Sequence, residues 1–389
     1  MSPGEFRCII SAQFSPRLPS YHWSFSAYKE IHTSDSAKRE TALRHATAPD
    51  ALTLSRLAAA RTGNHDEFSR LTEPYRRELS VHCYRMLGSL FDAEDVVQET
   101  LLRAWQKLDT FEGRASFRAW LYKIATNACL DALDRAPRRA LPMALYPAAD
   151  PRQALAPPVN DPVWLEPFPD ELLADVDANP EARYQARESI TLAFLIALQI
   201  LPPRQRAVLI LRDVLGWRAS EAAELLEFSV PAVNSALHRA RATLAKHFHV
   251  RGLDAVKATP PDDTMRALLD RYVRAWETAD IDELVALLKE DATFPMPPSP
   301  AWYQGRSAIR TFISSDILAG DAHGRWRLRP TRANTQPAFA WYRRDESRSA
   351  YQAFAIQVLT FDGDLLADVT TFANPILFSY FGLPLALKA

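Results

Sequence analysis

The chain has 389 residues, of which 48% are hydrophobic and 24% are charged, a composition typical of a globular protein with two or three domains. Its formal net charge of −1 excludes an evenly basic surface, so any basic patch has to be local and balanced elsewhere. The chain contains no run of about 18 apolar residues, which argues against a membrane span. Its first residues lack the charged and apolar regions of a signal peptide.

The cysteines and the absence of metal-binding motifs indicate the cellular setting. The three cysteines, Cys8, Cys83 and Cys129, lie far apart and form neither a CxxC pair nor a zinc-binding spacing. We therefore expect a reduced, cytoplasmic location. Residues 66–249 contain no phosphate-binding loop and no metal-ligand cluster, so we expect no catalytic site, no cofactor and no metal there.

The first half of the chain divides into three segments. Residues 1–62 are polar and weakly periodic, and we predict a disordered arm or an upstream extension from a misplaced start codon. Residues 63–135 have a helical pattern throughout. Residues 136–180 contain ten of the 28 prolines, together with alanines and acidic residues. Such a stretch cannot hold a long helix, and it predicts an extended linker.

The segment "AEDVVQETLLRAW" predicts an amphipathic helix. Val96, Leu101 and Trp105 share a face that suits a core. The projecting side chains are polar or charged: Asp92, Asp95, Gln98, Glu99 and Arg103. Taken alone, this segment favours a polar face that simply contacts solvent.

The next segment, "TFEGRASFRAWLYKIATNACLDALDR", predicts a loop followed by a helix. It combines aromatic and cationic side chains, which are the two kinds of group that hold single-stranded nucleic acid. We expect Phe117 and Trp120 to be core residues. The better candidates for DNA contact are polar or cationic: Arg114, Arg118, Lys123 and Asn127.

Helical periodicity returns over residues 181–250 and predicts a helix-turn-helix. A short apolar helix from about Ser220 to Leu226 precedes a three-residue turn. Ser229 can then cap a second helix, and Pro231 suits its first turn. In a helix-turn-helix the second helix lies in the DNA major groove. An ordinary helical hairpin in a bundle is the alternative.

The second helix of this pair has a buried stripe and a small, polar, basic front. The stripe is Val233, Leu237, Ala240 and Leu244, and Ser235 and His238 lie opposite. We expect this front to contact duplex DNA. The candidate residues are Ser229, Pro231, Asn234, Ser235, His238, Arg239 and Arg241.

Two segments together resemble one family. "DAEDVVQETLLRAWQKLDTFEGRASFRAWLYKIATNACLDALDR", residues 92–135, is similar to region 2 of the extracytoplasmic-function (ECF) group of bacterial sigma factors. "LPPRQRAVLILRDVLGWRASEAAELLEFSVPAVNSALHRARATL", residues 201–244, resembles region 4 of the same family. The resemblance implies binding to core RNA polymerase, at its β′ clamp helices and β flap, and to promoter DNA at the −10 and −35 elements. By resemblance, the candidate polymerase contacts are Asp95, Gln98, Glu99 and Arg103.

The sequence departs from this family in the helix-turn-helix. Glu227 stands where the turn usually carries Gly, and Arg218 stands where a capping Ser is common. The front of the second helix reads Asn-Ser-Ala at 234–236, where Lys-Ser-Arg is common. Fewer cations at this front suggest a different promoter sequence.

Residues 262–389 resemble the SnoaL-like branch of the nuclear transport factor 2-like fold, on "LLDRYVRAWETADIDELVALLKEDATFPMPPSPAWYQGRSAIRTFI" and "FANPILFSYFGLP". The resemblance implies an α+β cone with an internal pocket, which would take an unidentified small molecule. The candidate pocket-lining residues are Trp302, Tyr303, Trp326, Trp341 and Tyr351. Alternatively, these aromatic side chains simply fill the cone. Asp291, His323 and Asp368 are available acid–base groups, but nothing in the sequence marks them as catalytic.

The whole chain therefore predicts a multidomain fold, with two all-α sigma modules followed by an α+β cone-shaped domain at 262–389. We interpret it as an alternative sigma factor, not an enzyme, that is modulated by its C-terminal domain. The tail "PILFSYFGLP", residues 375–384, is the candidate contact with the sigma modules, or it packs on its own sheet. One alternative is a one-component, ligand-sensing DNA-binding regulator. Another is a small-molecule isomerase or cyclase activity in the C-terminal domain.

Overall fold

The computed structural model describes residues 51–113, 115–135, 138–159, 164–173, 190–251, 262–345, 347 and 349–388, with residues 51, 52 and 247–251 described by their backbone alone. The first described element is helix α3 (Ala51–Arg61), which packs on the next helix through the buried side chains of Leu57 and Ala60. Regular structure therefore begins inside the segment 1–62 that we expected to be irregular. Residues 1–50 lie outside the described residues.

The first module consists of helices α4 (His65–Leu87), α5 (Leu90–Gln106) and α6 (Phe117–Arg135), with a short 3-10 turn η2 (Leu108–Thr110) before α6. Side-chain caps set the helix starts. Asn64 accepts a hydrogen bond from the Glu67 backbone N–H, and Ser89 accepts one from the Asp92 backbone N–H at 3.0 Å.

Gly88 joins α4 to α5 at a point of close approach. Its φ of 71° is a left-handed conformation that favours glycine at the end of a helix. A Cβ atom at this position would lie 2.9 Å from the Gln199 side chain and 3.0 Å from that of Leu165. A side chain at residue 88 would therefore be strained by the positive φ and would force the Gln199 and Leu165 side chains to shift.

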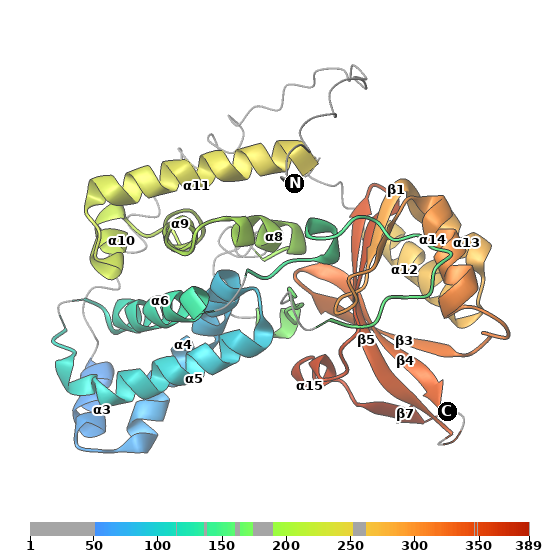
Figure 1. Cartoon of the computed structure of the whole chain (residues 1–389). Helices are drawn as coiled ribbons and strands as arrows, with labels where there is room; N and C mark the ends of the chain where they lie inside the picture. Colours follow the sequence, from blue (N-terminus) through green and yellow to red (C-terminus); the bar gives the residue numbers. More distant parts are fainter. Residues whose placement is uncertain are drawn as a thin grey trace, which may run out of the picture. The chain divides into compact units, whose positions relative to one another are not determined.

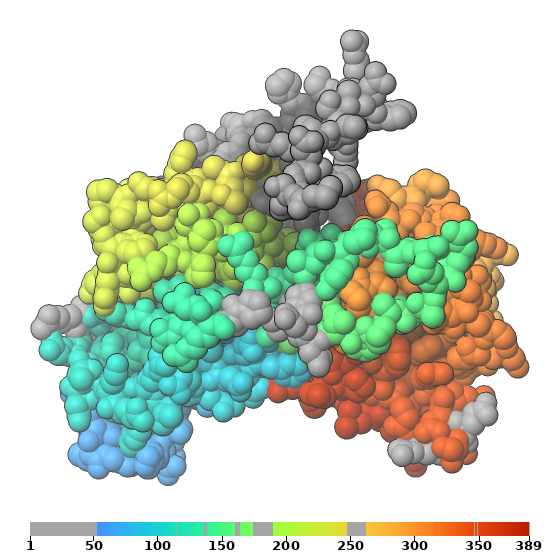
Figure 2. Space-filling model, in the orientation of Figure 1, coloured from blue at the N-terminus to red at the C-terminus, as the bar shows by residue number. Residues whose placement is uncertain are grey.

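The described parts of the linker contain no long helix, as the prolines predict, but they are not free. Two 3-10 turns occur, η3 (Pro142–Ala144) and η4 (Asp170–Leu172). Leu141, Leu165 and Phe168 are at most 2% exposed, so their side chains are buried in the core. Figure 2 shows the linker, in green, running over the surface of the C-terminal domain.

The second module consists of α8 (Leu192–Ile200), α9 (Pro203–Leu209), a π-helical turn η5 (Ile210–Val214), α10 (Ala219–Leu226) and α11 (Val230–Arg251). In Figure 1 these helices lie together, with α10 and α11 forming the predicted helix-turn-helix. The Ser229 hydroxyl accepts a hydrogen bond from the Ala232 backbone N–H at 3.3 Å, which confirms the predicted cap of α11.

The C-terminal domain is a helix-covered, curved sheet. Its helices are α12 (Asp262–Glu277), α13 (Ile281–Ala286), α14 (Arg306–Phe312), which continues into a π-helical turn η6 (Ile313–Ile317), and the short α15 (Leu377–Tyr380). Its strands are β1 (Leu288–Pro295), β2 (Trp302–Gln304), β3 (Trp326–Ala333), β4 (Gln336–Asp345), β5 (Ala350–Asp362), β6 (Leu365–Phe372) and β7 (Ala386–Lys388).

The strands form one mixed sheet in the order β2-β1-β6-β5-β4-β3, and β7 pairs with part of β5. The β1–β6 pair is parallel, and the other pairs are antiparallel. This arrangement confirms the predicted α+β architecture. A two-residue turn, Asn334-Thr335, joins β3 to β4, and both residues have positive φ values, 55° and 62°. Such values are those of the tight hairpin turn in which Asn is favoured.

The two faces of this sheet belong to two different cores. On the inner face, which helices α12, α13 and α14 cover in Figure 1, Trp326, Phe339 and Trp341 belong to one cluster with apolar residues of these helices. On the outer face, Tyr342 and Tyr351 belong to a second, continuous cluster. That cluster also contains α15 and the cores of both helical modules, so the outer face of the sheet shares a hydrophobic core with the rest of the chain.

Candidate nucleic-acid and protein interfaces

The exposed side of α11 carries most of the residues predicted to contact DNA. Six of the seven candidates are exposed: Ser229, Pro231, Asn234, Ser235, His238 and Arg239. The predicted stripe lies on the other side of the helix, where Val233 and Ala240 are fully buried. The helical period therefore separates a core face from a small, polar face that is available to a partner.

Arg241 is separated from this exposed set. Its guanidinium forms two hydrogen bonds with the carboxylate of Asp213, at 2.6 Å and 2.9 Å, and the Asp213 side chain is only 9% exposed. The pair joins α11 to η5 inside the second module. Arg241 therefore makes a structural contact within the chain, and its predicted phosphate contact stays a prediction.

The turn of the helix-turn-helix has an unusual residue in a left-handed conformation. Glu227 has φ 57° and ψ 41°, and its backbone N–H donates to the Ala223 carbonyl at the end of α10. This geometry favours glycine, the residue that is usual in the resembling family. Glu227 also forms an ion pair with Lys123 of α6 at 3.1 Å.

The candidate −10 residues on α6 are partly engaged within the chain. Arg118 makes a bidentate contact with Glu78 at 2.6–3.0 Å, and its guanidinium carbon lies 4.9 Å from the centre of the Tyr122 ring. Lys123 pairs with Glu227, and Asn127 is exposed. Arg114 lies outside the described residues.

The aromatic residues of this segment form a core cluster. Phe117 is 3% exposed and lies against Phe111, with ring centres 5.4 Å apart, and against Trp120, with ring centres 5.6 Å apart. The expectation that Phe117 is a core residue is confirmed. Trp120 is half-buried and packs against the same core.

The polar face of α5 is available to a partner. Asp95, Gln98 and Glu99 are exposed. Arg103, the fourth candidate, pairs with Glu99 at 2.7 Å and with Asp131 at 3.2 Å. Leu102 is 51% exposed on the same face, one turn after Gln98. The sequence prediction missed Leu102, although an apolar residue next to Leu101 has to lie outside the buried stripe of Val96 and Leu101.

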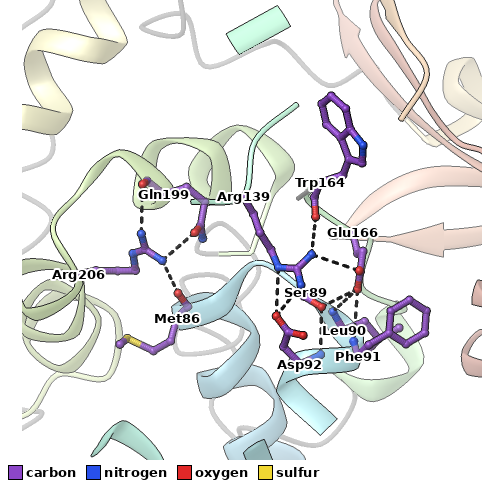
Figure 3. A network of polar contacts seen from close by, with 10 residues as sticks. All are labelled: Met86, Ser89, Leu90, Phe91, Asp92, Arg139, Trp164, Glu166, Gln199 and Arg206. Atoms are coloured by element: carbon purple, nitrogen blue, oxygen red, sulfur yellow. Dashed lines mark hydrogen bonds and ion pairs between the residues drawn. The ribbon is translucent and has the colours of Figure 1, made fainter. Parts of the chain in front are cut away.

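A network of polar contacts surrounds the start of α5, and sequence reasoning did not find it (Figure 3). The linker carboxylate of Glu166 accepts hydrogen bonds from the Ser89 hydroxyl at 2.8 Å and from the Leu90 backbone N–H at 2.9 Å. Burial raises the pKa of Glu166, and the neighbouring Arg139 acts in the opposite direction. A buried acceptor at a helix N-terminus satisfies N–H groups that would otherwise have no partner.

Arg139 connects this network to the linker and to α5. It pairs with Asp92 at 2.5 Å and with Glu166 at 3.4 Å, and it donates to the carbonyl of Trp164 at 2.7 Å (Figure 3). On the other side of the network, the buried Arg206 of α9 donates to the Met86 carbonyl and, at 2.7 Å, to the Gln199 side chain. The two arginines thus hold the first module against the linker and the second module.

The turn between β3 and β4 enters the same region. The fully buried side chain of Asn334 accepts from the Phe168 N–H at 2.9 Å, and it donates to the Tyr84 hydroxyl at 2.9 Å and to the Ile190 carbonyl at 2.8 Å. Tyr84 in turn donates to the carbonyl of Glu166 at 2.7 Å. One amide therefore contacts the first module, the linker and the start of the second module.

The five aromatic candidates for a pocket in the C-terminal domain do not share one lining. Trp326 and Trp341 pack on each other in the inner core, and Tyr303 stacks on Phe312. The Trp302 indole donates to the linker carbonyl of Tyr146, and Tyr351 belongs to the outer cluster. An open cavity of about 400 Å³ lies elsewhere, lined by Asp150–Arg152 of the linker and by residues of β1, β2 and α14.

The three acid–base candidates of this domain are not gathered into one site. Asp291 and His323 are exposed, and Asp368 accepts a hydrogen bond from the Thr293 hydroxyl at 2.6 Å. Across the residues that the structure describes, no three His, Cys, Asp or Glu side chains are placed to hold a metal ion. No helix in the described part of the chain is both long enough and apolar enough to cross a membrane.

Comparisons with known proteins match three parts of the chain. Family models match sigma-70 region 2 at residues 71–139, sigma-70 region 4 at residues 192–244, and the SnoaL-like domain at residues 269–369. The chain is 48% identical over 320 residues to the ECF RNA polymerase sigma factor SigG of Mycobacterium tuberculosis (strain H37Rv), which covers 82% of this chain and 84% of that protein. It is 30% identical over 193 residues to the ECF sigma factor SigW of Bacillus subtilis (strain 168), which covers 49% of this chain and 94% of that protein.

Among solved structures, the crystal structure of the Mycobacterium tuberculosis ECF sigma factor SigJ is 22% identical, with a TM-score of 0.49, and the match covers 80% of this chain and 98% of that one. The two sigma-70 models and the identity to SigG over most of both chains establish the family. The chain belongs to the ECF RNA polymerase sigma factors: it carries helical regions 2 and 4 followed by a C-terminal SnoaL-like domain, and it is a transcription initiation factor, not an enzyme.

Proposed function

We propose that this sigma factor binds core RNA polymerase through the exposed face of α5 and reads promoter DNA with α6 at −10 and with α11 at −35. Region 2 contacts the β′ clamp helices and region 4 contacts the β flap, in the cytoplasm. In the free protein, the C-terminal domain and the linker hold regions 2 and 4 together. Core polymerase then binds the form of the protein in which regions 2 and 4 have separated.

The spacing of promoter elements supports a closed free state. The −10 and −35 elements lie about 25 base pairs apart, which is about 85 Å along B-DNA. In this chain, Lys123 of α6 lies 3.1 Å from Glu227 in the helix-turn-helix turn, and the rings of Tyr122 and Trp217 are 5.4 Å apart. A protein in this arrangement cannot place α6 and α11 on both elements at once, so the modules have to separate on the promoter.

The single observation that carries the proposal is the position of Asn334. Its side chain hydrogen-bonds to Tyr84 of the first module, to Phe168 of the linker and to Ile190 at the start of the second module. If the Asn334 amide were removed while the modules stayed closed, the Tyr84 hydroxyl, the Phe168 N–H and the Ile190 carbonyl would each lose a buried hydrogen bond. Each such loss costs about 1–3 kcal/mol when the group stays buried. The closed arrangement therefore depends on the C-terminal domain.

The tail of the C-terminal domain supports the same proposal. Tyr380 of α15 makes an edge-to-face contact with Phe91 of α5, with ring centres 5.0 Å apart. Phe378 of the same tail packs on Tyr342 of its own sheet, with ring centres 5.1 Å apart. The tail thus contacts the sigma modules and also packs on its own sheet, so the two alternatives are compatible. In the closed form the tail touches the first turn of the helix that we assign to polymerase.

The test is transcription from candidate promoters with core polymerase and three forms of the protein: the full chain, residues 1–261, and Asn334→Gly. Glycine retains the positive φ of the turn and removes the amide. We expect Asn334→Gly to weaken docking by about 2–4 kcal/mol, to increase transcription and to expand the protein in small-angle scattering. Thr335→Gly is the matched control, because it adds a glycine to the same turn and keeps the Asn334 amide.

Two results would contradict the proposal. If neither the full chain nor residues 1–261 bound core polymerase, the assignment of α5 as the docking helix would be wrong. If both altered forms left transcription and scattering unchanged, the C-terminal domain would not control the separation of regions 2 and 4.

A further inference from the structure

The β3–β4 hairpin is strongly basic, although the whole chain has a formal net charge of −1. Residues 325–345 contain six arginines and one aspartate. No acidic residue of the hairpin itself balances this charge, apart from Asp345 at the end of β4. The hairpin is therefore a place where an anionic partner would be attracted.

Strand pairing places three of these arginines on the outer face of the sheet. Arg327 and Arg329 alternate with Trp326 and Leu328, which are buried in the inner core, so the two arginines project outward. Arg344 pairs directly with Tyr351, a residue of the outer cluster, so it shares that face. We call Arg327, Arg329 and Arg344 the outer basic patch, and all three are exposed.

These arginines differ from two cations on the helices of the same domain, which have acidic partners. Arg266 pairs with Asp263 at 2.8 Å, and Arg310 pairs with Asp282 at 2.5 Å. Among the described residues, no ion pair involves the outer basic patch. Arg327 stacks on the Tyr351 ring at 4.4 Å and donates to the Lys388 carbonyl. The charges of Arg329 and Arg344 are left to solvent or to a partner.

Protection of the sheet edge does not explain the whole patch. The strand β3 lies at the end of the sheet, and charged side chains on an edge strand prevent pairing with another chain. That reason applies to Arg327 and Arg329. It does not apply to Arg344, because β4 lies between β3 and β5. The three arginines lie on one face of two neighbouring strands, an arrangement that suits binding of an extended anion.

We infer that the outer basic patch binds the phosphate backbone of duplex DNA immediately upstream of the −35 element. This inference rests on the proposed function, which brings α11 to −35. Arginine forms bidentate hydrogen bonds with phosphate oxygens, and neighbouring outward residues of a strand are about 6.8 Å apart. Downstream DNA is occupied by region 2 and the polymerase, so upstream duplex is the free polyanion near this domain.

The length of the connection makes this contact feasible. Helix α11 ends at Arg251 and α12 begins at Asp262, so ten residues join them. Ten residues span at most about 35 Å. A domain of this size has a radius of gyration of about 14 Å. With α11 on the −35 element, the patch thus stays within reach of the next turns of upstream duplex.

The test compares two promoter templates bound by holoenzyme containing the full chain. One template ends just upstream of −35, and the other continues for about 20 more base pairs, or about 70 Å. We expect tighter binding and a steeper salt dependence on the longer template. In the double variant Arg329→Gln/Arg344→Gln this gain should disappear, with the slope of log K against log salt concentration reduced by about two.

Arg266→Gln/Arg310→Gln is the matched control, because it removes the same charge from the ion-paired helices α12 and α14. It should keep the gain from upstream DNA. An equal loss in this control, or equal affinity of the unaltered protein for both templates, would overturn the inference. If either of these results occurred but initiation on the short template were normal, the proposed function would stand. If initiation failed on both templates, the proposed function would be overturned, and this inference with it.

Discussion

Two residues with left-handed backbone conformations occupy the turns that matter most for the assembly of the modules. Asn334 suits its turn, because asparagine tolerates positive φ and its amide is used three times. Glu227 does not suit its turn, because a residue with a Cβ atom is strained at φ 57° and its carboxylate lies at the C-terminal end of α10. The two turns therefore respond differently to substitution.

At Glu227, we predict that Glu227→Gly raises the free energy of unfolding of the protein by about 1 kcal/mol, since it relieves the backbone strain. Thermal and urea unfolding of the full chain would measure the gain. Lys123→Ala removes the same exposed ion pair without changing the turn, and it should alter stability by less than about 0.5 kcal/mol. A loss of stability in Glu227→Gly would show that the carboxylate has another structural role.

On α11, two arginines two residues apart should behave in opposite ways. Arg239→Ala removes an exposed cation, so it should lower the salt slope of promoter binding by about one without affecting unfolding. Arg241→Ala leaves the largely buried Asp213 without its partner, so it should lower the free energy of unfolding by about 2 kcal/mol. Promoter titrations over a range of salt, together with urea unfolding, separate the two roles. A reduced salt slope for Arg241→Ala alone would reverse our assignment.

At the scale of elements, α4 and α6 are joined by a buried histidine. The ring Nε2 of His82 lies 2.9 Å from the Thr126 hydroxyl, and the His82 side chain is fully buried. Burial lowers the pKa of His82 from 6.5 to about 3, and the nearby Arg85 and Arg118 act in the same direction. The histidine is therefore neutral in the folded protein at any pH above about 3.

This burial predicts a pH dependence of stability. Below about pH 6.5 the histidine of the unfolded chain binds a proton, whereas the buried histidine of the folded protein does not. The free energy of unfolding therefore decreases as the pH is lowered from about 6.5 to about 3. Between pH 7.5 and 5.5, His82 should account for a loss of about 1.4 kcal/mol in the free energy of unfolding. Urea unfolding at both pH values should show a smaller loss in His82→Gln. His323→Gln changes an exposed histidine and should keep the full loss; an unaltered loss in His82→Gln would rule out this cause.

At the scale of the whole molecule, the linker is attached to the C-terminal domain at widely spaced points. The Ala149 N–H donates to the Trp302 carbonyl at 2.8 Å, and the Val159 N–H donates to the Pro298 carbonyl at 3.0 Å. Further along, the backbone of Phe168 exchanges hydrogen bonds with Asn334. The linker is irregular, as its prolines predict, but it is held in place by another domain.

This attachment changes the expected pattern of proteolysis. The composition of the linker predicts that protease cuts it first, because irregular segments are accessible. With its backbone held, we expect trypsin to cut slowly after Arg152 in the full chain and at least about tenfold faster in residues 1–261, where the C-terminal domain is absent. Mass spectrometry of timed digests would map the cuts. Equal rates in the two forms would mean that the contacts do not persist in solution.

The sequence by itself determined the local structure and the division of the chain. Proline content marked the linker, and the helical period of Val233, Leu237 and Ala240 separated the core face of α11 from its exposed face. Ser229 marked the start of that helix. These features could be predicted because capping and amphipathicity depend on residues only a few positions apart.

Only the tertiary structure decided which of the candidate cations are exposed and what holds the modules together. Arg241 meets Asp213 from 28 positions away, and Asn334 meets Tyr84 from 250 positions away. The thiols of Cys83 and Cys129, which look unrelated in the sequence, are both buried in the core of region 2, and burial raises the pKa of Cys129. Such pairs carry no periodic signal, because their geometry exists only once separate elements have packed and left polar groups that need a buried partner.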